Sequence, residues 1–304
     1  MWLLFAFSGP VLWAASTHID KYLVEKYFKH TDTTVLLVFT SLIGLWMLPF
    51  IWIFKPSVWM LPWQNMAIMG AAGMLYIGAM LFYLRALQSE EASVIAPLFQ
   101  ASTLFTFVLA YFFLGETLRW SGIVGALLIV LGVLSLSFEF SPRRRKFKAR
   151  MVWLMLVCTF VLALSMVLFK FYAVRDDFWV TTFWMYAGEA LFGVGILLIP
   201  RYARQFYALL QKNTGPMLAV NGSNELINLG GGLGVRFASL LAPVVLVSAV
   251  SSTTTLFVFV FGILLSLFMP RLGREDLSRK NLIRKGIAAV VITAGVVLAN
   301  LHAP

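Results

Sequence analysis

Residues 221–236 read Asn221-Gly-Ser-Asn224-Glu225-Leu-Ile-Asn228-Leu-Gly-Gly-Gly-Leu-Gly-Val-Arg236. Long apolar runs flank this stretch, which predicts that it crosses a membrane as a helix. The three asparagines and Glu225 are spaced i, i+3, i+4 and i+7, so they share one helix face. An ionisable group at membrane depth is costly against lipid, so this face should point at a protein interior or a wet cavity. A substrate or ion site and a polar contact between helices both fit this pattern.

The composition places the whole chain in a membrane. Of its 304 residues, 61% are hydrophobic and 12% are charged, whereas soluble domains carry roughly 25% charged residues. Apolar runs long enough to cross the hydrocarbon core recur throughout. They predict an all-α integral membrane protein with about ten transmembrane helices, at residues 2–20, 34–54, 65–87, 93–114, 119–138, 151–172, 179–199, 215–236, 243–268 and 283–301.

The net charge of +11 arises mainly from loops between the apolar runs. Most lysines and arginines follow the odd-numbered spans, and Arg143–Arg150 is the densest group. We therefore expect contact with anionic lipid and no binding of nucleic acid. The positive-inside rule places these loops in the cytoplasm and both termini outside. We expect a multi-pass protein of a bacterial inner (plasma) membrane.

The two halves of the chain resemble each other. Thr103-Leu-Phe-Thr-Phe107 resembles Thr255-Leu-Phe-Val-Phe259, and Gly132-Val-Leu resembles Gly295-Val-Val. With an odd number of spans in each copy, the second copy must be inverted in the membrane, as in many secondary transporters. The sequence thus divides into a first five-helix repeat, a basic cytoplasmic linker and a second five-helix repeat, at residues 1–140, 141–150 and 151–304.

Several first-half motifs carry a family resemblance. Ala92-Ser-Val-Ile-Ala-Pro97, Leu114-Gly-Glu116 and Gly122-Ile-Val-Gly125 resemble the EamA repeat of the drug/metabolite transporter superfamily, while the second half has Leu272-Gly-Arg-Glu275 in a longer loop. The resemblance implies ten helices in two inverted five-helix repeats around a central cavity. It also implies alternating-access transport of small metabolites such as amino acids, amines, nucleotide-linked sugars or phosphorylated compounds.

Two acids lie deep in their predicted spans. Glu189 and Glu225 are each about ten residues from a span end, or about 15 Å along a helix, near mid-membrane. Either carboxylate is a candidate for proton coupling or for binding a cationic substrate. For Glu189, a hydrogen-bonded packing role is the alternative. Lys170 and Arg236 fall near predicted helix ends and are expected to snorkel, so the absence of a central cation argues against phosphate substrates.

Further candidates line the predicted cavity. His18 is a candidate proton relay or an interfacial side chain. Tyr76 and Tyr83, spaced by seven, face the cavity or pack. The hydroxyls among the polar residues of spans 4 and 9 either face the cavity or bond their own helix carbonyls. Glu116 is expected to cap the next helix or to steady the loop rather than to contact substrate. The expected substrate-binding residues are Asn221, Asn224, Glu225, Asn228, Tyr76, Tyr83, Gln100, Ser251 and Ser252, and the expected proton-coupling residues are Glu225, Glu189 and His18.

No enzyme signature accompanies these residues. The sequence has no Gly-x-Ser-x-Gly motif and only three histidines, and we expect no metal and no cofactor. The sequence therefore predicts a secondary transporter, a monomer or homodimer, that moves a small polar metabolite, most readily an amine or amino-acid-like solute, and couples this to protons. A flippase for lipid-linked substrates and a membrane scaffold without transport are the alternatives.

Overall fold

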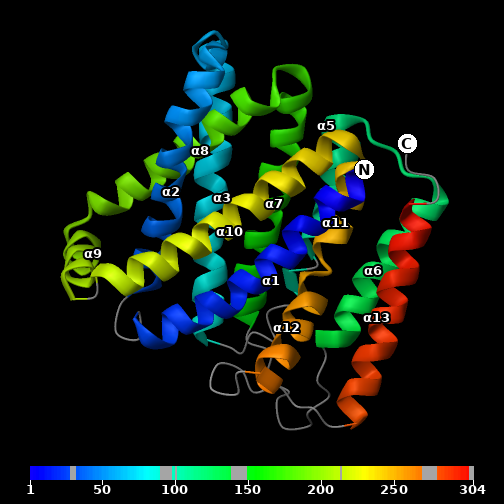
Figure 1. Cartoon of the computed structure of the whole chain (residues 1–304). Coiled ribbons are helices and arrows are strands. Elements are labelled where there is room, and N and C mark those ends of the chain that lie inside the picture. The colour runs from blue at the N-terminus through cyan, green and yellow to red at the C-terminus, as the bar shows by residue number, and fades with distance from the viewer. Residues whose placement is uncertain are drawn as a thin grey trace.

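The computed structural model describes residues 1–27, 32–89, 98–99, 101–137, 149–212, 214–268 and 279–300, and over these ranges its regular elements are helical (Figure 1). The elements are α1 Trp2–Lys26, α2 Thr33–Phe54, the 3-10 turn η1 Pro56–Trp59, α3 Trp63–Ser89, α5 Ala101–Leu114, α6 Trp120–Ser137, α7 Ala149–Arg175, α8 Phe178–Leu197, α9 Pro200–Lys212, α10 Thr214–Leu241, α11 Val244–Ser251, α12 Thr254–Phe268 and α13 Arg279–Asn300.

The all-α class and the multi-pass membrane character are confirmed. Helices occupy the predicted spans wherever the chain is described. Six segments are long and apolar enough to cross a membrane, and the last of them runs across α11 and α12; they are Trp2–Asp20, Thr34–Phe54, Trp63–Ala86, Val152–Arg175, Phe178–Leu197 and Val244–Leu265. Shorter apolar segments lie at Ala101–Leu114, Trp120–Gly132 and Gly286–Gly295. The long α10 is absent from both groups because its asparagines, glycines and charges lower its hydropathy.

The region after residue 200, expected to be a loop, instead forms the helix α9. Its Phe206 and Leu209 are buried against α2, where the rings of Phe206 and Phe39 lie 4.8 Å apart. Arg204 is exposed on the opposite side. The apolar face of α9 is therefore used within the protein, and α9 lies at one edge of the molecule (Figure 1). A sequence search for uniformly apolar segments of membrane-spanning length does not detect such a helix.

Span 9, expected to be continuous, is broken into α11 and α12. The break falls at Ser252 and Thr253, whose hydroxyls donate to the carbonyls of Ala249 and Val250 at 2.6 and 2.7 Å. Such local side-chain bonds compete with the backbone ladder of a helix. Of the two alternatives left open for these hydroxyls, the structure shows bonds from Ser251–Thr254 to carbonyls three or four residues earlier in the chain.

Glycines bring α1 and α10 into close contact. A Cβ on Gly234 would lie 1.9 Å from Oγ of Ser8, and a Cβ on Gly9 would lie 2.3 Å from Val235. The side chains of Ser8 and Val235 would have to shift to admit a Cβ at either position, so the glycines favour this close approach, as small residues do in other helix contacts within membranes. The glycine run of α10 therefore lies at its contact with α1.

Several helix pairs have a counterpart when the two predicted halves of the chain are exchanged. α1 packs on α10 and α7 packs on α3; α12 packs on α1 and α5 packs on α7. The equivalent helices α6 and α13 pair with each other at one edge (Figure 1), as do α2 with α8 and α5 with α11. Exchanging the predicted halves converts this set of contacts into itself.

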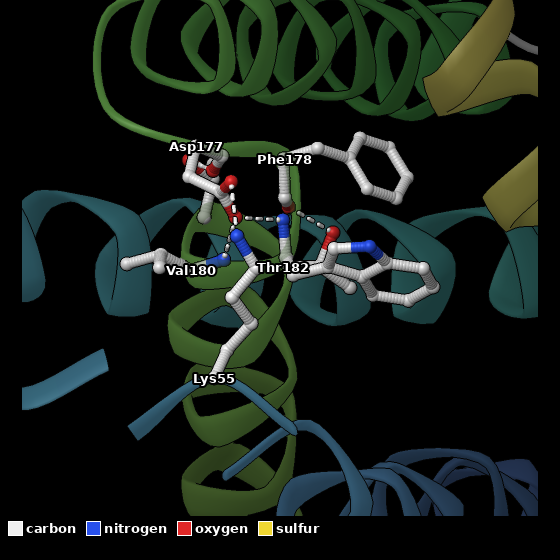
Figure 2. Close-up of polar contacts among 7 residues, drawn as sticks. Lys55, Asp177, Phe178, Val180 and Thr182 are labelled. Atoms are coloured by element: carbon white, nitrogen blue, oxygen red, sulfur yellow. Dashed lines mark hydrogen bonds and ion pairs between the residues drawn. The ribbon is translucent and has the colours of Figure 1, made fainter. Parts of the chain in front are cut away.

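Asp177 joins the turn before α8 to the end of α2, as Figure 2 shows. Its carboxylate accepts from the amides of Trp179 and Val180 at 2.8 and 3.1 Å, and from Nζ of Lys55 at 3.0 Å. Partial burial alone would raise the pKa of Asp177, but Lys55 and the two amides outweigh burial and lower the pKa below its ordinary value. One side chain thus caps a helix and anchors it to another. Within the same turn the hydroxyl of Thr182 donates to the Phe178 carbonyl at 2.7 Å.

Candidate functional site

Polar side chains from α1, α2 and α10 meet inside the helix bundle. The amide Nδ2 of Asn224 donates to Oδ1 of Asp20 at 2.6 Å. The hydroxyl of Thr40 donates to Oε1 of Glu225 at 2.7 Å. Asn221, Asn224 and Glu225 are 3%, 0% and 3% exposed, so all three are removed from solvent and lipid. We call these five residues, Asp20, Thr40, Asn221, Asn224 and Glu225, the polar cluster.

The predicted face of α10 thus points into the protein, as its spacing indicated. Asn228 is partly buried and lies within hydrogen-bonding range of Glu225. Two of the buried oxygens have no hydrogen-bond partner, Oδ1 of Asn221 and Oδ1 of Asn224. Buried polar atoms are usually paired, so each exception needs an explanation. The polar cluster therefore contains more acceptors than its own donors satisfy.

Asp20 and Thr40 are two members that the sequence analysis did not name; Asp20 is the last residue of the predicted span 2–20. α1 continues beyond it to Lys26, and Leu23 is buried against Val35 and Val38 of α2. Asp20 consequently lies within a packed helix, within hydrogen-bonding range of Ser16. The i, i+4 spacing of Ser16 and Asp20 was the available signal. Thr40, also missed, carries no pattern that marks it in the sequence.

Glu189 belongs to a different cluster. Its Oε1 accepts from Nη2 of Arg236 at 3.1 Å, and the two side chains are 6% and 9% exposed. The rings of Tyr76, Phe169 and Tyr186 lie 5.7, 5.4 and 5.0 Å from the guanidinium carbon. The expectation that Arg236 snorkels is wrong, because α10 continues to Leu241 and keeps this cation buried. A cation–π environment and one carboxylate replace water around it.

Lys170 likewise has a partner within the protein. Its Nζ lies 2.5 Å from Oε1 of Glu116 and donates to the Ala242 carbonyl at 2.7 Å. The second oxygen of Glu116 accepts from the Val244 amide at 2.9 Å. Glu116 therefore caps α11 rather than the next helix, α6, so the expectation for α6 is wrong. The expected snorkelling of Lys170 is also wrong, because its ammonium group binds Glu116 and the Ala242 carbonyl inside the protein.

The remaining candidates lie outside the polar cluster. Tyr76 contacts Arg236 as described, and Tyr83 packs edge-to-face on Phe99 at 4.9 Å. His18 Nε2 lies 3.0 Å from the Val258 carbonyl of α12. Ser251 and Ser252 donate to the carbonyls of Val247 and Ala249. Gln100 and the basic linker at 141–148 lie outside the described residues. In the described ranges, His, Cys, Asp and Glu side chains form no group of three that would hold a metal ion.

The membrane-length helices and the polar groups buried between them define the class, a multi-pass helical membrane protein. Residues 1–138 match the EamA-like transporter family, the signature of the drug/metabolite transporter superfamily, which confirms the resemblance. Members of this family are transporters, not enzymes. No curated protein matches the chain. Among 25 matching chains of solved structures, one described only as "Crystal structure of protein" is 17% identical, with a TM-score of 0.69 over 99% of this chain and 96% of that one. That likeness shows a shared fold.

Proposed function

We propose that this protein is a secondary active transporter that moves a small polar metabolite, an amine or amino-acid-like solute, across a membrane by alternating access. The observation that carries the proposal is the polar cluster, with carboxylates on two helices and buried amide oxygens without donors. A purely structural contact between helices would be expected to satisfy its own hydrogen bonds. The EamA-like match over residues 1–138 supports the transporter class.

The ten-helix arrangement in two inverted repeats is part of this proposal. The helix pairings named above support it, because α1 with α10 corresponds to α7 with α3, and α12 with α1 corresponds to α5 with α7, when the halves are exchanged. The division is the one expected from sequence, with repeats at 1–140 and 151–304 joined by 141–150. The broken helix α11–α12 supports it as well, since transporters commonly place discontinuous helices beside a substrate site.

Proton coupling, in this proposal, is assigned to Glu225 rather than Glu189. Glu225 has a neutral partner, Thr40, whereas Glu189 is bound to the cation of Arg236. A carboxylate with a neutral partner gains or loses a proton without leaving a buried counter-charge unpaired. His18 faces a backbone carbonyl of α12 and is the secondary candidate. The basic loops are assigned to the cytoplasm and both termini to the outside of an inner membrane.

Flux into vesicles reconstituted with the purified protein tests the proposal. Labelled amines and amino acids, offered with and without an imposed pH gradient, should enter faster than into protein-free vesicles. Glu225→Gln should reduce the gradient-driven component at least tenfold. Asp176→Asn, an exposed carboxylate that bonds Asn65, is the matched control and should leave flux unchanged. Flux of none of these solutes, together with scrambling of a labelled lipid, would support a flippase instead; neither activity would support a scaffold.

A further inference from the structure

We infer that the polar cluster binds a primary ammonium group, held between the carboxylates of Asp20 on α1 and Glu225 on α10. This inference rests on the proposed function and narrows its substrate class to solutes that carry such a group. Asp20 then becomes the residue that determines specificity, since it adds a second charge and a second helix to the site. The argument follows from the donors and acceptors that meet there.

The cluster is short of hydrogen-bond donors. The Thr40 hydroxyl already donates its hydrogen bond to Glu225, and the amide group of Asn224 already donates one to Asp20. Oδ1 of Asn221 and Oδ1 of Asn224 receive nothing, although both side chains are at least 97% buried. Carboxylates accept several hydrogen bonds each. Ser16 and Asn228 already lie within hydrogen-bonding range of Asp20 and Glu225. A ligand that completes the cluster must therefore bring at least two N–H or O–H donors, one for each unpartnered amide oxygen.

The cluster also carries excess negative charge. Asp20 bonds Asn224 and Thr40 bonds Glu225, which are adjacent residues of α10, so the cluster holds two carboxylates and no cation among its members; like charges in a poorly hydrated site repel. The described cations near the core are engaged elsewhere, Arg236 with Glu189 and Lys170 with Glu116. A cationic ligand between the two carboxylates relieves this repulsion. An ammonium group supplies a positive charge and three donors in one compact unit.

A proton alone does not complete the site. One proton on Asp20 or Glu225 lowers the charge, but it leaves the amide oxygens of Asn221 and Asn224 without donors. A quaternary ammonium ion has the charge but no N–H donor, and it is usually recognised by aromatic faces, which here surround Arg236 instead. A primary ammonium group is the ligand that meets both the charge and the donor requirement.

The position of Asp20 connects binding to motion. Asp20 and Glu225 lie on helices from different halves of the chain, and the glycine contact holds these helices together. A ligand can contact both carboxylates at once only when α1 and α10 lie against each other as they do in this structure. The ligand therefore biases the equilibrium between arrangements of the halves by its differential affinity for them.

Thermal unfolding of the purified full chain in detergent tests the inference with four probes at equal ionic strength: propylamine hydrochloride, 1-propanol, tetramethylammonium chloride and sodium chloride. Propylammonium should raise the melting temperature saturably, because a ligand that binds only the folded state stabilises it by mass action. Propanol lacks the charge, tetramethylammonium lacks the donors, and neither should match it. An equal rise with sodium chloride would overturn the inference in favour of a metal-ion site, and an equal rise with either organic control would overturn it outright.

Variants identify the residues. Asp20→Asn and Glu225→Gln should each weaken the apparent affinity for propylammonium at least tenfold, while Asp176→Asn should leave it unchanged. Asn221→Leu removes an amide oxygen that has no hydrogen-bond donor and keeps the side-chain volume similar. It should weaken the affinity for propylammonium while preserving the fold of the free protein. This variant serves as the test if a carboxylate variant fails to fold. Affinity unchanged in the variants that fold would refute the site.

The vesicle assay separates this inference from the proposed function. Flux of solutes without a primary amine, undiminished in Asp20→Asn, would preserve the transporter and remove the ammonium site. Saturable propylammonium binding that depends on Asp20, in a protein that moves no solute, would preserve the site and remove the transporter.

Discussion

Replacing Glu189 with leucine removes the counter-charge of Arg236 while keeping the side-chain volume similar. The pair is 91% or more buried at both side chains and its atoms are 3.1 Å apart, so breaking it leaves a desolvated charge, at a cost of roughly 3–5 kcal/mol. The surrounding rings of Tyr76, Phe169 and Tyr186 offset part of that cost, since a desolvated cation–π contact contributes about 2 kcal/mol. We therefore expect a loss near the lower end of the range, about 3 kcal/mol.

A double-mutant cycle measures the coupling directly. Arg236→Met should lose a similar amount by leaving Glu189 unpaired, whereas the double variant should lose less than either single variant, because an apolar pair of similar volume replaces a buried ion pair at little cost. The assay is reversible unfolding of the detergent-solubilised protein. Lys55→Met, which breaks the more exposed pair with Asp177, is the control and should cost under about 1 kcal/mol. Additive losses in the cycle, within about 0.5 kcal/mol, would refute the reasoning.

Other perturbations have expected outcomes of their own. Asp177→Ala should cost about 1 kcal/mol through the lost cap. Because folding lowers the pKa of Asp177, this stabilisation is present above the ordinary aspartate pKa of about 3.9 and disappears as pH falls through the lower pKa of the folded state. The melting curves of variant and wild type should therefore converge below about pH 4. Gly188→Ala places a Cβ 1.9 Å from a carbonyl of α3 and should destabilise by about 1–3 kcal/mol, whereas Gly195→Ala, with open space around its Cβ, should be neutral or stabilising in the same assay. Glu116→Gln keeps an acceptor for the α11 amide but loses the charge opposite Lys170, and chemical unfolding should show a loss of about 1.5–3 kcal/mol.

Much of the fold follows from sequence because lipid imposes one dominant constraint, that apolar helices of a set length recur. The face of α10 that carries Glu225 was predictable for the same reason, since a polar stripe in an apolar run must be hidden. The partners of that face were not predictable. Asp20 lies at the edge of an apolar run, and only the packing of Leu23 beyond it shows that the helix continues inward.

Charges near helix ends show the limit of the sequence-based argument. Lys170 and Arg236 both lie where snorkelling is the usual outcome. Each instead meets a carboxylate that is distant in sequence, and such pairing depends on helix neighbours that no local pattern encodes. Helix α9 illustrates the complementary case, because its amphipathic pattern was present in the sequence but fell outside a search for uniformly apolar spans.

The cap on α11 has a consequence for how the chain is made. Glu116 accepts a hydrogen bond from the amide of Val244, and it is synthesised 128 residues earlier. During synthesis the first half enters the membrane with that carboxylate unmatched, and Lys170 is the earlier of its two partners to emerge from the ribosome. The helix start at Val244 remains uncapped until both halves have assembled. Two halves expressed as separate polypeptides would therefore have to find each other in the membrane before either is complete.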